Sequence, residues 1–165
     1  MNRLSYTVQA PPLTNEEIES MLKENRYARI CTHNKDGTIH VMPVAYRYIN
    51  GQIVIISIAR SRKNRNVLRN NDVSVLIDTL DPLKGMLIYG TAEIDYDNIY
   101  EQAVQVLEGA AEMRGMPKEK VQRITKAYLD AFESVIMKIT PKHFTTFDYT
   151  KDETWQNFLK TYLQK

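Results

Sequence analysis

The segment richest in side chains that can do chemistry runs from Ser57 to Lys63 and reads Ser-Ile-Ala-Arg-Ser-Arg-Lys. The apolar run over 53–58 predicts a strand that is buried on both faces. Ser61 is a favoured N-cap residue, so we expect a short helix over 62–70. The first N–H groups of a helix lack internal acceptors and lie at the positive end of its dipole. The junction between strand and helix is therefore suited to binding a phosphate.

The side chains at this junction match that chemistry. The planar guanidinium of Arg62 can hold phosphate oxygens with two hydrogen bonds, and the Lys63 ammonium adds a point charge. The hydroxyls of Ser57 and Ser61 can donate further hydrogen bonds. The alternative interpretation is a solvated basic helix whose cations face water, and the residues alone leave both open.

The junction lies within a wider basic window over 37–71, where 35 residues include no acid although the whole chain carries a formal charge of only +2. Its cations are Arg47, Arg60, Arg62, Lys63, Arg65 and Arg69. A local excess of this kind calls for an anionic partner. Residues 52–71 contain no aromatic side chain on which bases could stack, which argues against nucleic acid. We expect a small anionic ligand.

The first half of the chain predicts the strands that would hold this junction in place. A capping box at Thr14 and Glu17 opens a helix that should stop near Asn25. Strands are expected at 27–33, 38–48, 53–58, 73–78 and 86–95, with Pro43 interrupting the second of them. Turn signals at 36–37 and 50–51 indicate hairpins.

The second half is more helical. Apolar periodicity predicts helices from Ile99 to about Gly115 and from Pro117 to Phe132, then strands at 135–139 and 144–149 separated by Pro141. An amphipathic helix closes the chain, with Trp155, Phe158, Leu159, Tyr162 and Leu163 at helical spacing. We expect one mainly β domain over 1–165, an antiparallel barrel of six to seven strands with peripheral helices. Its expected parts are an N-terminal arm (1–12), an inserted helical pair (97–134) and a C-terminal helix (152–163).

The segment over 57–63, continuing to Val-Ser-Val-Leu at 73–76, resembles the flavin mononucleotide (FMN) segment of the pyridoxamine 5′-phosphate oxidase-like family. The preceding hairpin, with Asp36-Gly37, Pro43-Val44 and Asn50-Gly51, is similar as well. The resemblance covers roughly residues 13–95, and more loosely 138–141. It implies the FMN-binding split β-barrel fold and a homodimer with two flavin sites at the subunit interface.

The resemblance also implies roles for individual residues. It assigns Arg62 and Lys63 to the flavin phosphate, and Ser57 and Ser61 to the phosphate or the ribityl chain. Met42, Pro43 and Val44 would lie on the strand that runs along the isoalloxazine ring, while Met86 and Leu87 match a strand contributed by the neighbouring subunit. The pyridoxamine phosphate oxidases themselves carry Arg and Lys where this chain has Val41 and Tyr46, and their C-terminal Arg and Trp pattern has no match. We therefore do not expect this chain to oxidise pyridoxamine phosphate.

The expected function is that of an FMN-dependent oxidoreductase that reduces a small organic acceptor, with the cofactor carrying the redox chemistry. No side chain stands out as its acid or base, so the catalytic residues are unknown. Three alternatives stay open: the same fold holding the deazaflavin F420, the same fold holding haem, and a flavin-binding protein without turnover.

The remaining candidate residues indicate little chemistry. His33, His40 and His143 lack metal-ligand spacing, so no metal site is expected. His40 lies on the expected flavin strand, whereas His143 and Trp155 receive no role. The single cysteine, Cys31, is interpreted as packing, because no neighbouring base would stabilise its thiolate. The chain shows no signal peptide and no apolar run long enough for a membrane span, so a cytoplasmic protein is expected.

Overall fold

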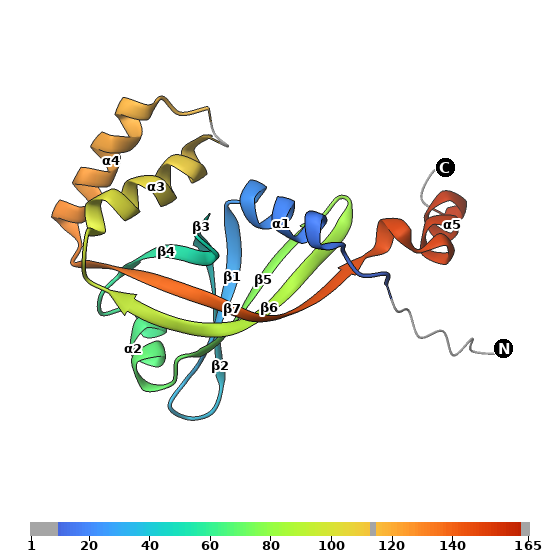
Figure 1. Cartoon of the computed structure of the whole chain (residues 1–165), viewed down its shortest axis with the longest axis horizontal. Helices are drawn as coiled ribbons and strands as arrows, with labels where there is room; N and C mark the ends of the chain where they lie inside the picture. Colours follow the sequence, from blue (N-terminus) through green and yellow to red (C-terminus); the bar gives the residue numbers. More distant parts are fainter. Residues whose placement is uncertain (1–9, 113–114, 163–165) are drawn as a thin grey trace.

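A computed structural model of the chain describes residues 10–112 and 115–162. These residues form one antiparallel seven-stranded sheet in the order β2-β1-β5-β6-β7-β4-β3, with helices around it (Figure 1). The strands are β1 (Tyr27–His33), β2 (Ile39–Ala45), β3 (Arg47–Ile49), β4 (Gln52–Ile58), β5 (Asp72–Leu80), β6 (Leu83–Asp95) and β7 (Ser134–Asp148). The helices are α1 (Asn15–Glu24), α2 (Arg62–Arg69), α3 (Ile99–Glu112), α4 (Lys118–Ala131) and α5 (Glu153–Tyr162), with a short 3-10 helix, η1 (Tyr149–Lys151). The expected mainly β fold with peripheral helices is confirmed.

The long strands β6 and β7 curve across the whole molecule and give the sheet its half-barrel shape (Figure 1). One face of the sheet forms the interior, where Ile30, Val75, Ile88 and Met137 are almost completely buried. On the opposite face, α3 covers β4 and β7 through a cluster of Val54, Val106 and Ile136. Because β4 is thus covered on both sides, its sequence is a continuous apolar run rather than an alternating one.

The prediction of two strands separated by Pro141 was wrong, since β7 continues through this residue. The register between β6 and β7 shifts at this point, so that Tyr89 lies opposite His143 and Gly90 lies opposite Pro141. A Cβ atom on Gly90 would lie 2.4 Å from the carbonyl oxygen of Thr140, so only glycine allows this approach. A β-bulge with glycine opposite proline lets the strand pass where proline would otherwise end it.

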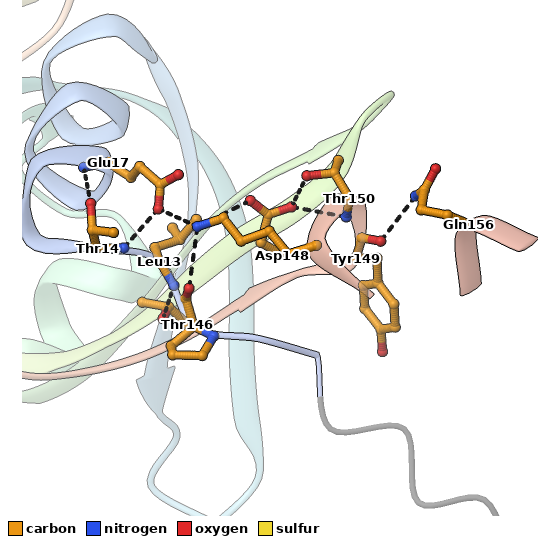
Figure 2. A network of polar contacts seen from close by, with 10 residues as sticks. Leu13, Thr14, Glu17, Thr146, Asp148, Tyr149, Thr150 and Gln156 are labelled. Atoms are coloured by element: carbon orange, nitrogen blue, oxygen red, sulfur yellow. Dashed lines mark hydrogen bonds and ion pairs between the residues drawn. The ribbon is translucent and has the colours of Figure 1, made fainter. Parts of the chain in front are cut away.

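The N-terminal end of α1 is fastened to the end of β7 by polar contacts (Figure 2). The predicted capping box is present, and Leu13 N–H donates a hydrogen bond to Thr146 Oγ1 at 2.9 Å. Lys151 Nζ lies 2.5 Å from Glu17 Oε2. Residues 1–9 of the expected arm and Leu163 of the expected final helix lie outside the described residues.

The remaining helices occupy separate places around the sheet (Figure 1). Helix α2 follows β4, and the antiparallel pair α3–α4 stands over the end of the barrel where β1 begins and β2 ends. Helix α5 projects beyond the end of β7 and has no buried residue, so its aromatic stripe does not cover the barrel. No helix in the described part of the chain has the length and apolar character needed to cross a membrane.

Candidate functional site

The junction between β4 and α2 brings two serine hydroxyls together. Ser57 is 2% exposed at the end of β4, and Ser61 occupies the N-cap position of α2. The Ser61 side chain makes no capping hydrogen bond, and its Oγ instead lies 3.2 Å from Ser57 Oγ. Ser57 donates a hydrogen bond to Asn64 Oδ1 at 3.0 Å. Ser57 thus belongs to the buried part of the junction, while Ser61 lies nearer the surface.

Asn64 is a residue of this junction that sequence reasoning missed. It is 1% exposed, and its Nδ2 donates to the carbonyl oxygens of Ile58 at 2.9 Å and Ala59 at 3.2 Å. The same amide oxygen receives the Ser57 hydroxyl, so one side chain joins the strand, the turn and the helix. Asn64 and Val67 are three residues apart and therefore lie on the same face of α2. Because Val67 is expected to face the core, this spacing could have predicted that Asn64 is buried too.

The first turn of α2 presents its backbone N–H groups without an acceptor inside the helix. The first helical hydrogen bond runs from Arg65 N–H to the Ser61 carbonyl at 3.2 Å. The N–H groups of Arg62, Lys63 and Asn64 precede it, and the first turn contains no acidic residue. An anion placed here would meet N–H donors and the positive end of the helix dipole.

The cations of the basic window separate into two groups. Arg60 pairs with Glu133 at 3.4 Å, Arg65 donates to the Arg60 carbonyl at 2.8 Å, and Arg69 donates to the His33 carbonyl. Arg62 and Lys63, in contrast, make no ion pair with a carboxylate among the residues that the structure describes. The two cations predicted to hold a phosphate are therefore available to an anionic ligand.

The beginning of β2 lies within electrostatic reach of this junction. Burial lowers the pKa of the Lys63 ammonium. Burial also lowers the pKa of His40, and the charges of Arg62 and Lys63 lower it further. His40 lies opposite Thr32 of β1, whose Oγ1 accepts a hydrogen bond from Asn66 of α2 at 3.0 Å. The first turn of α2 and the start of β2 thus border the same region.

The three residues predicted along the flavin ring follow His40 on β2. This strand pairs with β1 alone and forms an edge of the sheet. Met42 is 40% exposed, Pro43 is exposed on the opposite face, and Val44 is buried. An edge strand tolerates Pro43, which donates no hydrogen bond, and it leaves backbone groups open to a ligand.

The structure does not bring Met86 and Leu87 to this region within one chain. They lie on β6, separated from β2 by β1 and β5. Met86 is fully buried in the interior, so its side chain has no surface to offer, while Leu87 is half-buried on the outward face of the sheet. Any contribution of these residues to a flavin would have to come from a second copy of the chain.

The surroundings of Tyr46, Cys31 and His143 indicate packing rather than a part in the site. Tyr46 is fully buried and donates a hydrogen bond to the Leu22 carbonyl at 3.1 Å, and burial raises its pKa far above the usual value. Burial likewise raises the pKa of Cys31, which keeps its thiol protonated. His143 stacks on Tyr89 with ring centroids 5.9 Å apart. No group of three or more metal-ligating side chains occurs in residues 10–112 and 115–162.

Taken together, these residues fit the phosphate end of a flavin nucleotide. The N–H groups of the first turn of α2 and the two cations provide the donors that a phosphate dianion needs, with the Ser61 hydroxyl beside them, and no carboxylate opposes it in the first turn of α2. The open strand β2 begins beside them.

The family profile of pyridoxamine 5′-phosphate oxidase matches residues 14–148. The chain belongs to this family, and the resemblance seen in its sequence is confirmed. The match extends from α1 to the end of β7 and so includes the junction and the sheet.

Relatives of known name and structure add detail. A 5a,11a-dehydrotetracycline/5a,11a-dehydrooxytetracycline reductase of Streptomyces rimosus is 34% identical over 91 residues, which cover 50% of this chain and 63% of that protein. The chain thus matches less than two thirds of this relative's length.

Solved structures share the fold. A conserved hypothetical protein of Mycobacterium tuberculosis, Rv2991, superposes with a TM-score of 0.71 at 24% identity, covering 86% of this chain and 88% of that one. An F420 reductase gives 0.60 at 18% identity, covering 77% and 94%. An FAD-binding protein of Mesorhizobium loti gives 0.58 at 21% identity, covering 84% and 96%.

Proposed function

We propose that this protein binds FMN and uses it to reduce a small organic acceptor. The observation that carries the proposal is the β4–α2 junction, where Ser61, Arg62 and Lys63 surround the N–H groups of a helix whose first turn contains no acid. The carboxylate of Asp36 lies within electrostatic reach of Arg62. Membership in the pyridoxamine 5′-phosphate oxidase family and the reductase among its relatives support the same conclusion.

The residues of the chain would bind and orient the cofactor. Arg62, Lys63 and Ser61 hold the phosphate, and the hydrogen bonds of Asn64 fix the turn that carries them. The exposed backbone of β2 at Met42 and Pro43 borders the ring. When bound in reduced form, the flavin supplies a hydride equivalent. A proton from water would suffice to complete the reduction.

We further propose that the working form is a homodimer. The outward face of β1, β2, β5 and β6 carries Ile39, Val41 and Tyr89, which are 53%, 51% and 42% exposed. Val41 lies opposite Cys31, Cys31 opposite Ser74, and Ser74 opposite Tyr89, so these side chains form a row across four strands. A second copy packed on this face would cover the row and bring its own Leu87 near the flavin ring.

A second candidate is binding of the deazaflavin F420 in the same place. The shared fold with an F420 reductase favours it. Both candidates reduce a small acceptor and both need the phosphate donors of α2.

Calorimetric titration of the purified protein with FMN, riboflavin and F420 tests these proposals. Riboflavin lacks the phosphate, so FMN should bind more than about tenfold more tightly. Equal affinity for FMN and riboflavin would contradict the phosphate assignment. Tighter binding of F420 than of FMN would favour the second candidate.

A further inference from the structure

The helical pair α3–α4, the start of β1 and the end of β2 line an apolar cavity that is open to the surface. The cavity measures about 220 Å³. Its wall is formed by β-strand, α3 and α4 residues that include Tyr27, Ala45, Leu107, Ala111, Val121 and Ile124. At its mouth Tyr27 and Ile124 are 42% and 43% exposed, so the cavity communicates with the surface.

Two sets of charged groups border this region: Glu108 of α3 pairs with Lys118 of α4 at 3.6 Å, and two arginines lie on the other side of α3. Leu107 and Ala111 are four residues apart and share the face that lines the cavity. Gly109 lies on the opposite face, where a Cβ atom would come within 2.7 Å of Arg47 Nη1 and 2.9 Å of Arg26 Cδ. Glycine therefore lets α3 lie directly on the two arginines, and among the described residues that line the cavity the Tyr27 phenol is the one ionisable group.

Size and polarity define what the cavity accepts. An engineered apolar cavity of roughly 150 Å³ holds one benzene ring, so about 220 Å³ accommodates one or two rings. A helix of a partner protein, roughly 10–12 Å wide, is too large. A charged group would lose its hydration without gaining a partner. The fitting occupant is the hydrocarbon, ring-containing part of a small molecule.

The cavity lies at the far end of the strand that begins at the phosphate junction. His40, beside Arg62 and Lys63, and Ala45, in the cavity wall, are roughly 17 Å apart along β2. A flavin held by its phosphate and extended along Met42–Val44 would point its ring system toward the cavity. We propose that the cavity binds the apolar ring portion of the acceptor, which makes ring-containing, uncharged compounds the substrate class. The identity of the ligand as an acceptor rests on the proposed function, whereas the binding of apolar rings does not.

Fluorescence titration with N-phenyl-1-naphthylamine, an uncharged two-ring probe, tests the cavity without any flavin. Wild-type protein should bind it saturably, and Ala111→Phe, which fills the cavity, should weaken binding at least about tenfold. Ile124→Asp, at the exposed mouth, gives a second variant that does not depend on repacking a buried site. Ala127→Phe and Gln122→Asp place the same changes on exposed positions of α4 outside the wall and should bind like wild type.

The flavin-loaded protein provides a second readout. Ala111→Phe should raise KM about tenfold for menadione, a two-ring quinone, whereas Ala127→Phe should leave it unchanged. Unaltered probe binding in both wall variants would overturn the inference, even if FMN binds as proposed. An altered oligomeric state with unaltered probe binding would identify a second copy as the occupant and would also overturn it. A third outcome separates the two proposals. If the wild-type protein takes up no flavin but binds the probe, and the wall variants lose the probe, the cavity binds apolar rings as inferred and the proposed function is wrong.

Discussion

The hydroxyl oxygens of Ser57 and Ser61 lie 3.2 Å apart, one at the buried end of β4 and the other at the N-cap of α2. Because Ser57 gives its hydrogen to Asn64, its oxygen can accept from Ser61 and hold that side chain in place. The Ser61 hydroxyl is engaged in this contact rather than in capping the helix. Since both hydroxyl hydrogens are used inside the junction, an anion would first meet the N–H groups of α2 and the Arg62 and Lys63 cations, and Ser61 can donate to it only by releasing Ser57.

Loss of the Lys63 charge should weaken FMN binding and spare riboflavin. Lys63→Met keeps most of the half-buried stem but removes the ammonium, so we expect at least about tenfold weaker FMN binding. Arg65→Met is the matched control, because the Arg65 guanidinium is directed to the Arg60 carbonyl. Calorimetry with both ligands measures the effect, and equal losses for FMN and riboflavin would argue against a phosphate contact.

Replacement of Asn64 should damage both stability and binding. Asn64→Leu has a similar volume but leaves Ser57 and the carbonyls of Ile58 and Ala59 without their partner. Buried groups left unsatisfied cost about 1–3 kcal/mol each at most, so a loss of a few kcal/mol in the free energy of unfolding is expected. Urea unfolding measures it, with Asn71→Leu at an exposed neighbouring position as control. A variant as stable as wild type would show that Asn64 does not organise the junction.

Acid stability should depend on Asp95. A hydrogen bond and ion pair with Lys138, aided by Asp97 N–H and Gln102, lowers the pKa of Asp95 to about 2. Since the folded-state pKa lies below the unfolded value near 3.9, this carboxylate stabilises the fold above about pH 4, and that stabilisation is lost as the pH falls toward 2.

Asp95→Asn should therefore lower the free energy of unfolding by about 1 kcal/mol at neutral pH. The difference from wild type should disappear near pH 2, as followed by urea unfolding at a series of pH values. Asp97→Asn, at an exposed neighbouring position, is the control. A difference that persists unchanged to pH 2 would contradict the assigned role.

A charge at Val41 should separate the proposed dimer. Val41 is 51% exposed at the β2 end of the outward row, where a carboxylate would lose its hydration on association. Val41→Glu should sediment as a monomer at concentrations where wild type is a dimer, whereas Ala127→Glu on α4 should not change the mass. Wild-type protein that sediments as a monomer would contradict the dimer proposal directly.

Local chemistry allowed much of this fold to be predicted from the sequence. The capping box at Thr14 and Glu17 forms as expected, and the hairpin at Asn50-Gly51 has positive φ at both residues. These features depend on residues close in sequence, for which propensity and pattern are informative.

The failures came from long-range contacts. Pro141 ends no strand, because Gly90, distant in sequence, lies opposite it at the bulge. The sequence analysis gave Asn64 no role, because its hydrogen bonds with Ser57, Ile58 and Ala59 form only once the turn between β4 and α2 has folded back on the helix. The apolar cavity formed by α3 and α4 with Tyr27 and Ala45 joins four separate segments and has no local signature in the sequence.

The central claim is that the β4–α2 junction holds the phosphate of FMN. The most direct measurement is the visible absorption spectrum of the purified protein after incubation with FMN and removal of excess ligand, with the mass of the released molecule determined. We predict a yellow protein that releases FMN, and a colourless Arg62→Ala, Lys63→Ala variant treated in the same way. A wild-type protein that stays colourless after incubation with FMN would contradict the claim.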